Sequence, residues 1–459
     1  MPSSAELYPL VHAWVQALPG PHPLHPAALS ALAHLVTAVL VGQSLRPSAL
    51  MRALLSPSPV PARQRYKRVA RAWTRPWLSP AWLVPRLVRA ALALVAPDPP
   101  GYPTAGWTHL ALDTVRCGRW EVVTLGVVWH GRVLPVGWTV LPYPLPKGQF
   151  TPAVCALLRQ VAAVWPAERP AHVVADRGFP SRLLFRTLAQ VGWGWTVRLR
   201  AGLAVTVAGQ ARLVRAQLAH AQLDGWTATE ARYGSGADAV AGTLVVGRGL
   251  VVLPAHQRGA GSLRHRARRL AEHQHNRHAR RPRRAPDGTG PTGRLGPWGD
   301  LDVWVVLFTS HPTWRAAGAS YRRRWAAEGS YRDAQSGWDG QHGWALDPAL
   351  ARLSTARQVE RVVGLWALAT LVQTWVGDRV GQATAPLAVQ AVVREWTTTG
   401  RLSVWARGRL ALTEPSGQLR GWLTPTLLAG AGQVAAAPPP PVRVVSLPER
   451  AASAPARAA

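Results

Sequence analysis

Two aspartates of this chain lie in or at the end of apolar segments, where a lone carboxylate needs a partner. Asp113 follows the mostly apolar residues 109–112, and Asp176 follows residues 172–175. A buried charge is costly unless it is paired or binds a metal ion. Either aspartate, taken alone, is more often a helix cap or half of an ion pair, so metal binding and ion pairing both stay open.

A third acid lies in the segment SYRRRWAAEGSYRDAQSGW. Its residues Tyr321, Arg324, Glu328 and Gln335 are separated by three, four and seven positions, so one continuous α-helix would place all four along one face. Such a face could offer a metal ligand, a phosphate contact and a stacking ring. The alternative is a surface helix with an Arg-Glu pair four residues apart, which contributes only a few tenths of a kcal/mol.

Weaker candidates for a third carboxylate are Asp333 and Asp302. At the second aspartate, Arg177 and Gly178 follow directly, and a glycine lets a substrate backbone come close. Ligands at the carboxyl ends of strands are common in α/β sheets. For Asp113, Asp176 and Glu328 to meet, the strands that carry the two aspartates must therefore end beside the helix that carries the glutamate.

The elements between residues 106 and 200 fit that requirement. Three β-rich runs joined by short turns (WTHLALDTVR, WEVVTLGVVWH, RVLPVGWTVLP) predict an antiparallel meander. A helix is expected over 152–164, a strand over 171–178, a helix from Ser181 and a strand over 194–200. Later, residues 301–310 indicate a strand and 314–334 a helix. This order predicts an α/β fold with a mixed sheet flanked by helices.

Residues 1–98 contain short helical segments separated by prolines and predict a helical N-terminal region. In 63–73, five basic residues alternate with Tyr66 and Trp73, a pattern that could follow phosphates while a ring stacks on a base. A solvated face of a core helix is an equally good interpretation.

The second half carries a strongly basic run over 264–294, which indicates a DNA-contacting arm, a disordered loop, or a loop that orders on nucleic acid. Trp298 follows it and is a candidate for stacking on an extruded base. The Ala/Pro-rich residues 433–459 are expected to be disordered. Six units are predicted along the chain. They are an N-terminal helical DNA-binding region (1–98), the first part of a ribonuclease-H-like catalytic core (99–200), a β-rich and basic insertion (201–300), the second part of the core (301–400), a C-terminal region (401–432) and a tail (433–459).

The charge balance points to a polyanionic partner. The chain has 53 basic and 22 acidic residues, a formal charge of +31, and its only lysines are Lys67 and Lys147. Arginine grips phosphate through two parallel hydrogen bonds and reaches base edges, so nucleic acid outranks a small acidic substrate. Base composition of a GC-rich gene explains part of the arginine excess, but it does not explain the scarcity of acids.

The cysteine content and the N-terminal sequence indicate the cellular compartment. Cys117 and Cys155 are the only cysteines, so a disulfide framework and a cysteine-based zinc site are both excluded. Neither a basic segment followed by a long apolar run at the start nor an apolar stretch of about 20 residues is found. A cytoplasmic, nucleoid-associated protein without a membrane segment is expected.

The segments LALDT, VVADRGF and Y-x2-R-x3-E together resemble the transposases of bacterial insertion sequences that have a ribonuclease-H-like catalytic domain and a Tyr-Arg-Glu-Lys signature. The resemblance spans about residues 105–376. It implies that Asp113, Asp176 and Glu328 hold two divalent metal ions, and that Tyr321 and Arg324 hold DNA near the cleavage point. The signature lysine falls on Gln335, which has no charge.

The resemblance also implies DNA cleavage followed by strand transfer at one site with two Mg²⁺ ions, for which Mn²⁺ can substitute, and a homodimer on paired DNA ends. Arg332 is a candidate substitute for the missing lysine. The candidate DNA-binding residues are Tyr321, Arg324, Arg332, Gln335, Arg177 and Trp298. Two other functions stay open: a ribonuclease-H-like nuclease that cuts without joining, and an inactivated transposase kept as a DNA-binding protein.

Overall fold

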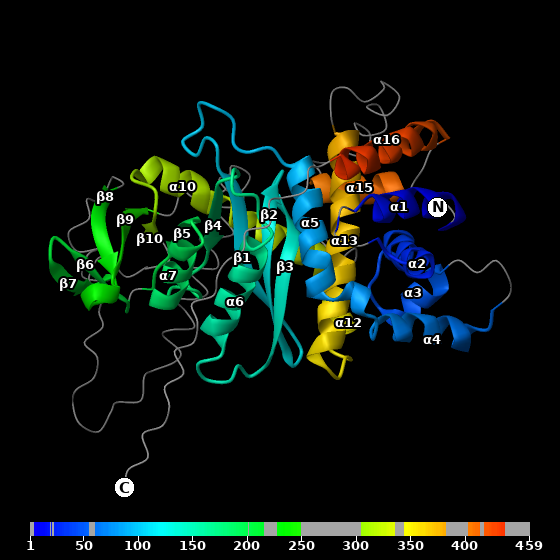
Figure 1. Ribbon diagram of the computed structural model, residues 1–459, viewed down its shortest axis with the longest axis horizontal. Coiled ribbons are helices and arrows are strands. Elements are labelled where there is room, and N and C mark those ends of the chain that lie inside the picture. Colours follow the sequence, from blue (N-terminus) through cyan, green and yellow to red (C-terminus); the bar gives the residue numbers. More distant parts are fainter. Residues whose placement is uncertain are drawn as a thin grey trace, which may run out of the picture.

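A single mixed sheet runs through the part of the chain that the computed structural model describes, which is residues 4–18, 20, 23–54, 60–200, 202–214, 227–248, 304–335, 344–381, 403–413 and 417–436. Within these residues the sheet has ten strands in the order β3-β2-β1-β4-β5-β10-β9-β8-β6-β7 (Figure 1). The strands are β1 (Thr108–Cys117), β2 (Trp120–Trp129), β3 (Arg132–Pro142), β4 (Ala171–Ala175), β5 (Gly194–Arg198), β6 (Ala204–Val207), β7 (Gln210–Leu213), β8 (Thr227–Tyr233), β9 (Val240–Arg248) and β10 (Trp304–Thr309).

The first half of the sheet confirms the elements expected from the sequence. Strands β1, β2 and β3 form the antiparallel meander, and β4 and β5 add to β1 in parallel. Helix α6 (Phe150–Ala162) precedes β4, and α7 (Arg182–Gln190) follows it. Ser181 is the N-cap residue of α7, and its side chain accepts a hydrogen bond from the Leu184 amide at 3.1 Å. The fold is therefore mixed α/β.

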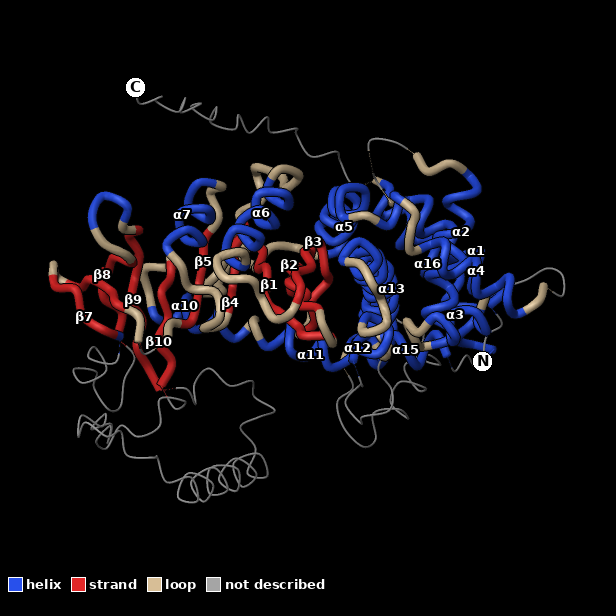
Figure 2. The backbone as a smooth tube through the Cα atoms, turned by 90° about the horizontal axis from the view of Figure 1, so that it is seen from below, coloured by secondary structure: helices blue, strands red, loops and turns tan. Residues whose placement is uncertain are grey.

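The insertion extends the same sheet. Strand β10 lies between β5 and β9 and is antiparallel to both, so β6–β9 continue the sheet beyond the core. Side chains alternate across β10. Phe308 meets Phe185 of α7, with ring centroids 5.0 Å apart, whereas Leu307 packs with residues of α10 (Trp314–Arg322). Figure 2 shows α6 and α7 on one face of the sheet and α11 (Trp325–Gln335) on the other.

The expectation of one continuous helix over 314–334 is wrong. Helix α10 ends at Arg322 and α11 begins at Trp325, with a turn at Arg323 and Arg324 between them. Across the turn the backbone bonds shift to a shorter spacing, with the Arg324 amide donating to the Tyr321 carbonyl at 3.0 Å. The two arginines of the turn are each held by a different acid, Arg323 by Asp98 and Arg324 by Glu328.

Helices gather at the β3 end of the sheet (Figure 1). The long helix α13 (Ala356–Val380) packs against β3, and the N-terminal helices pack around it. The other members of this helical end are α1 (Ser4–Ala17), α2 (Pro26–Gly42), α3 (Pro47–Ala53), α4 (Ala62–Ala72), α5 (Pro80–Leu94), α12 (Leu346–Leu350), α15 (Val404–Thr413) and α16 (Gly417–Ala435).

Three prolines of residues 1–98 begin helices as the sequence suggests, whereas Pro9 and Pro85 lie inside α1 and α5 and do not separate helices. Pro26, Pro47 and Pro80 each stand in the first turn of a helix, where the missing N–H costs no hydrogen bond. At the other terminus, α16 extends two residues past position 433, the first of the expected Ala/Pro-rich tail, and residues 437–459 lie outside the described residues.

In the described part of the chain, no single helix has both the length and the apolar character to cross a membrane. Helices α2 and α3 meet those criteria only as a pair, with a bend of 101° between them.

Candidate active site

Parallel pairing of β1 with β4 brings the two aspartates together. His109 is registered with His172 and Leu112 with Ala175, so Asp113 and Asp176 are the next pair along the two strands. Each aspartate lies four residues after its histidine, and side chains at that interval share one face of a strand. The acids and the histidines therefore form two neighbouring pairs on the face that α10 covers.

This repeat is visible in the sequence as HLALD and HVVAD, and sequence reasoning missed it. Two apolar runs with histidine and aspartate at the same interval indicate two strands that present the same pair of groups. A histidine in an apolar run is a weaker signal than an acid, because a neutral imidazole can be buried without a counter-charge.

Arg324 connects the third acid to the strand. Its Nη2 atom donates to Glu328 Oε1 at 2.6 Å, and its Nη1 atom lies 3.9 Å from Asp113 Oδ2. Arg324 is only 4% exposed, whereas the Glu328 side chain is 39% exposed. The guanidinium thus lies between an acid of the sheet and an acid of α11, and solvent reaches the site beside Glu328.

Tyr321 holds the second aspartate. Its hydroxyl donates to Asp176 Oδ1 at 3.2 Å. The ring packs among Val245, Val305 and Leu307 and is 2% exposed, so in this arrangement it does not offer the stacking face that the helical spacing suggested. Burial is the main reason that the pKa of Tyr321 rises to about 12; Arg324 opposes the rise and Asp176 adds to it. Tyr321 is therefore a neutral hydrogen-bond donor.

The charges of the site act on one another. Burial raises the pKa of Asp113 to about 6, Arg324 and the Thr114 amide oppose this rise, and Glu328 and Asp176 add to it. The Thr114 amide donates to Asp113 Oδ1 at 2.8 Å. Burial alone lowers the pKa of Arg324, but Tyr321, then Glu328 and Asp176, more than offset this and leave it raised. The three acids and the arginine form one electrostatic unit.

Asp333, the weaker candidate for the third acid, faces another partner. Its Oδ2 atom accepts a hydrogen bond from Arg132 Nε at 2.5 Å, and the aspartate is 3% exposed. One helical turn earlier, Ser330 accepts from the Val133 amide at 2.7 Å. These contacts fasten α11 to the start of β3, which leaves Glu328 as the acid of α11 beside Arg324. Asp302 lies outside the described residues.

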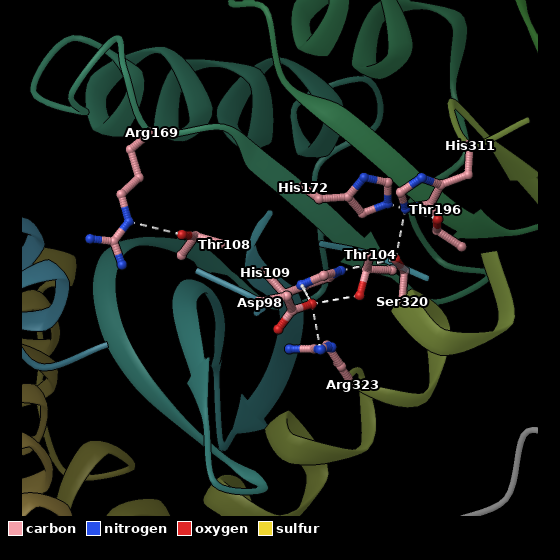
Figure 3. A network of polar contacts seen from close by, with 10 residues as sticks. All are labelled: Asp98, Thr104, Thr108, His109, Arg169, His172, Thr196, His311, Ser320 and Arg323. Atoms are coloured by element: carbon pink, nitrogen blue, oxygen red, sulfur yellow. Dashed lines mark hydrogen bonds and ion pairs between the residues drawn. The ribbon is translucent and has the colours of Figure 1, made fainter. Parts of the chain in front are cut away.

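A buried polar network holds the end of α10, as Figure 3 shows. Asp98, before β1, accepts hydrogen bonds from Thr104 and from Arg323 Nη2, each at 2.5 Å. The Ser320 hydroxyl lies 2.9 Å from His109 Nε2 and 2.8 Å from His311 Nε2. These contacts fix Ser320 and Arg323, the residues that directly precede Tyr321 and Arg324.

Asp98, His109 and Ser320 are connected in the order of an acid, base and nucleophile triad. The His109 Nδ1 atom lies 3.5 Å from Asp98 Oδ2 and makes no hydrogen bond. Ser320 is 0% exposed and its hydroxyl also contacts His311. Because a nucleophile must reach its substrate, this connectivity is a packing arrangement and does not indicate hydrolase chemistry.

The histidines of the network are neutral. His172 and His311 stack with ring centroids 4.1 Å apart, and His172 Nε2 lies 2.8 Å from the Thr196 hydroxyl. Burial, then Arg323 and His311, lowers the pKa of His109 to about 2, and burial lowers that of His311 to about 4. Neutral imidazoles can join hydrogen bonds under the acids without adding charge.

The acids fit a divalent cation by donor chemistry. In the described part of the chain, no three His, Cys, Asp or Glu side chains are grouped closely enough to hold a metal ion as they stand. A cationic guanidinium lies among the three carboxylates instead, in contact with Glu328 and near Asp113. Carboxylate oxygens are the ligands that Mg²⁺ prefers, so the donor set suits that ion once the arginine moves aside.

The remaining candidate residues are spread around this unit. Arg332 of α11 and Arg177, after Asp176, are exposed. Gln335 is half-buried at the end of α11, and its carbonyl accepts from the Ala345 amide at 3.1 Å. An added Cβ at Gly178 would meet nothing within 4 Å, so the surface beside Asp176 is open. Trp298 and the basic run 264–294 lie outside the described residues.

Comparison with known proteins gives a family for part of the chain. No curated protein matches it. A family model described as Transposase DDE domain matches residues 146–342, a range that includes Asp176, Tyr321, Arg324 and Glu328 and begins after β3. Asp113 precedes the matched range and reaches the site through the pairing of β1 with β4. The chain accordingly carries a transposase DDE domain over residues 146–342.

Proposed function

We propose that this chain is the transposase of a bacterial insertion sequence, with a ribonuclease-H-like core that cuts DNA at the element ends and joins those ends to a target. Asp113, Asp176 and Glu328 are its catalytic acids. The observation that carries this proposal is the gathering of three carboxylates around one buried arginine, within and beside a transposase DDE domain. The resemblance to the Tyr-Arg-Glu-Lys group supports the finer assignment.

The same three acids would hold two Mg²⁺ ions, with Mn²⁺ as a substitute. When bound, the ions would activate a water or a 3′-hydroxyl and stabilise the leaving oxygen at phosphorus. Asp113 and Asp176 are held ready by the sheet register, and Tyr321 fixes the orientation of Asp176 through its hydroxyl. The contacts of α11 with β3 keep Glu328 beside them.

DNA is the proposed partner, bound as double-stranded element ends and target by a homodimer in the cytoplasm, at the nucleoid. The net charge of +31 supports a polyanion. Exposed basic residues on α4, which include Arg63, Lys67 and Arg71, supply a surface for phosphates in the N-terminal region. Near the acids, the proposed contacts are Arg324, Arg332, Gln335, Arg177 and Trp298, whereas Tyr321, whose ring is buried, orients Asp176 instead.

The test is a cleavage and joining assay with linear DNA that carries the sequences flanking the gene as element ends. We expect the wild type to nick these ends with Mg²⁺ or Mn²⁺ and Asp113→Asn and Glu328→Gln to lose at least about a hundredfold of the rate, the size of effect seen when one group that stabilises a transition state is removed. Asp238→Asn, an exposed acid paired with Arg186 far from the site in sequence, is the matched control and should cut like the wild type. Equal cutting by the wild type and both site variants refutes the assignment.

Gln335 favours a second candidate, an inactivated transposase that binds DNA. The position carries no charge where the related signature has a lysine. Pre-cleaved ends separate the possibilities, because a transposase joins them to a target, a nuclease only cuts uncleaved ends, and a DNA-binding relic does neither. Restoring the charge with Gln335→Lys should raise the joining rate if the lost lysine limits it.

A further inference from the structure

The Arg324 guanidinium stands where a cation is needed most in this site. It is bonded to Glu328 at 2.6 Å, lies 3.9 Å from Asp113, and interacts electrostatically with Asp176. Its surroundings are nearly closed to solvent, since Arg324 is 4% exposed. The three acids are half-buried and repel one another, and a cation among them offsets that repulsion.

Arg324 nevertheless keeps a donor unused. Its Nε atom is buried and has no hydrogen-bond partner. Arginine binds phosphate in a planar, two-bonded arrangement that uses adjacent N–H groups. The contact at Asp113, at 3.9 Å, is longer than a hydrogen bond. The side chain is thus held by charge, by one strong bond and by a cation–π contact with the Trp325 ring at 4.7 Å, and it would satisfy more of its N–H donors on a phosphate.

The backbone of Arg324 belongs to neither of the two helices beside it. Arg324 lies in the turn between α10 and α11, outside both helices. On one side Arg323 is fixed to Asp98, and on the other α11 is fixed to β3 through Ser330 and Asp333. A rotation of the Arg324 side chain therefore requires no movement of the helix that carries Glu328.

We propose that Arg324 is the resident counter-cation of the three acids, which holds them together before metal arrives, competes with the metal for Glu328 and Asp113, and is drawn away by a DNA phosphate. This rests on the proposed function, and assigns Arg324 a role toward the metal as well as toward DNA. Metal and DNA then bind cooperatively, because DNA removes the competitor. Reciprocity requires that metal strengthen DNA binding by the same factor.

Mn²⁺ binding to the full-length protein, followed by electron paramagnetic resonance, tests the competition without any turnover. We expect Arg324→Gln to bind Mn²⁺ about tenfold more tightly than the wild type in the absence of DNA, a change that corresponds to about 1.4 kcal/mol. Arg324→Lys keeps the charge and should stay close to the wild type. The matched control is Arg315→Gln, which removes one exposed positive charge from α10, and its Mn²⁺ affinity should not change.

A random-sequence DNA duplex tests the coupling. Adding the duplex should raise the Mn²⁺ affinity of the wild type by about fivefold or more, at the lower end of usual coupling factors. The Arg324→Gln protein should show no such rise. A wild type whose Mn²⁺ affinity is indifferent to the duplex, or a variant that keeps the full rise, overturns the proposal.

Thermal melting in EDTA and in Mn²⁺ checks that each variant is folded. Arg324→Gln should melt below the wild type in EDTA and gain more from Mn²⁺, because the ion replaces the missing cation; an equal gain in both proteins argues against competition. Asp113→Asn identifies the site. If Mn²⁺ binding depends on Asp113 but is the same with and without Arg324, this inference fails and the proposed function stands. If the wild type binds no Mn²⁺ even with DNA, the metal assignment itself fails.

Discussion

The buried charge of Asp113 lowers the stability of the folded protein. Burial raises its pKa from an ordinary value of 3.8 to about 6. Between these two values the folded state binds the proton more tightly than the unfolded chain does, so stability falls as pH rises through this window. Above about pH 6 the carboxylate is ionised and the cost is complete, and a shift of this size corresponds to at most about 3 kcal/mol.

Asp113→Asn should therefore stabilise the metal-free protein. Asparagine keeps an oxygen for the Thr114 amide and carries no charge at any pH. In EDTA the variant is expected to melt above the wild type at pH 7 to 8, with a difference that shrinks toward pH 4. Melting curves across this range provide the measurement. A difference that is constant with pH, or one that grows toward acid, would show that the charge is not the cause.

Single residues were predictable where their chemistry is unusual for their place. The acids were found because charge in an apolar run needs a partner, and the pairing of Arg324 with Glu328 follows from their spacing of four. The bond between Asp98 and Arg323 was not predictable, because it joins positions 225 residues apart and nothing local marks either one. His109 and His172 carried a repeated signal that only a search for paired spacings would find.

At the scale of elements, strands and helices of the first half follow from the sequence pattern, since apolar alternation and N-capping act locally. The break between α10 and α11 does not. Helical periodicity continues through Arg323 and Arg324, whereas Asp98 and Asp113, the acids of the sheet side that they face, belong to distant segments. The proposed roles of Arg324 depend on this break between the two helices, which helical periodicity does not reveal.

Helix α4 offers a prediction for DNA binding. Arg63, Lys67 and Arg71 are spaced by four residues, so they share one exposed face. We expect the double variant Lys67→Gln with Arg71→Gln to bind duplex DNA more weakly and to lower the slope of log affinity against log salt by about two, since each lost phosphate contact contributes about 0.9. Melting temperature should not change, because both side chains are exposed.

A matched pair for this measurement lies on α7. Arg182 and Arg186 are exposed and face Asp238, which already offsets part of their charge. Changing both to glutamine removes the same number of charges, and the salt slope is expected to stay near that of the wild type. If this pair lowers the slope as much as the α4 pair, binding follows total charge and α4 has no special part in it.

Over the whole molecule, two helices of the flanking helical end meet backbone to backbone. An added Cβ at Gly377 of α13 would clash with the Val404 carbonyl and lie 2.6 Å from the Gly408 amide of α15; one at Gly408 would clash with the Gln373 carbonyl. Since α13 also packs on β3, this crossing fixes the C-terminal helices relative to the sheet. The crossing depends on which glycines face each other, and no local sequence pattern shows that.

Gly377→Ala is accordingly expected to lower the free energy of unfolding by about 1 to 3 kcal/mol, as overpacking does. Gly432→Ala in α16 is the control, because an added Cβ there meets nothing within 4 Å. Alanine favours a helix over glycine by up to about 1 kcal/mol, so the control should be as stable as the wild type or more so. Chemical denaturation compares them, and a Gly377→Ala protein as stable as the wild type would mean that the two helices can separate at little cost.

The pairing of β1 with β4 has one more consequence. Neighbouring strands are held about 4.8 Å apart by their backbone bonds, so the interval between Asp113 and Asp176 is set by the peptide ladder. Deleting one residue early in β4 would turn Asp176 and His172 together to the opposite face. Such a deletion would remove an acid from the site and would also leave an acid and an imidazole facing the apolar layer under α6 and α7. A loss of the strand register would therefore impair folding as well as the site.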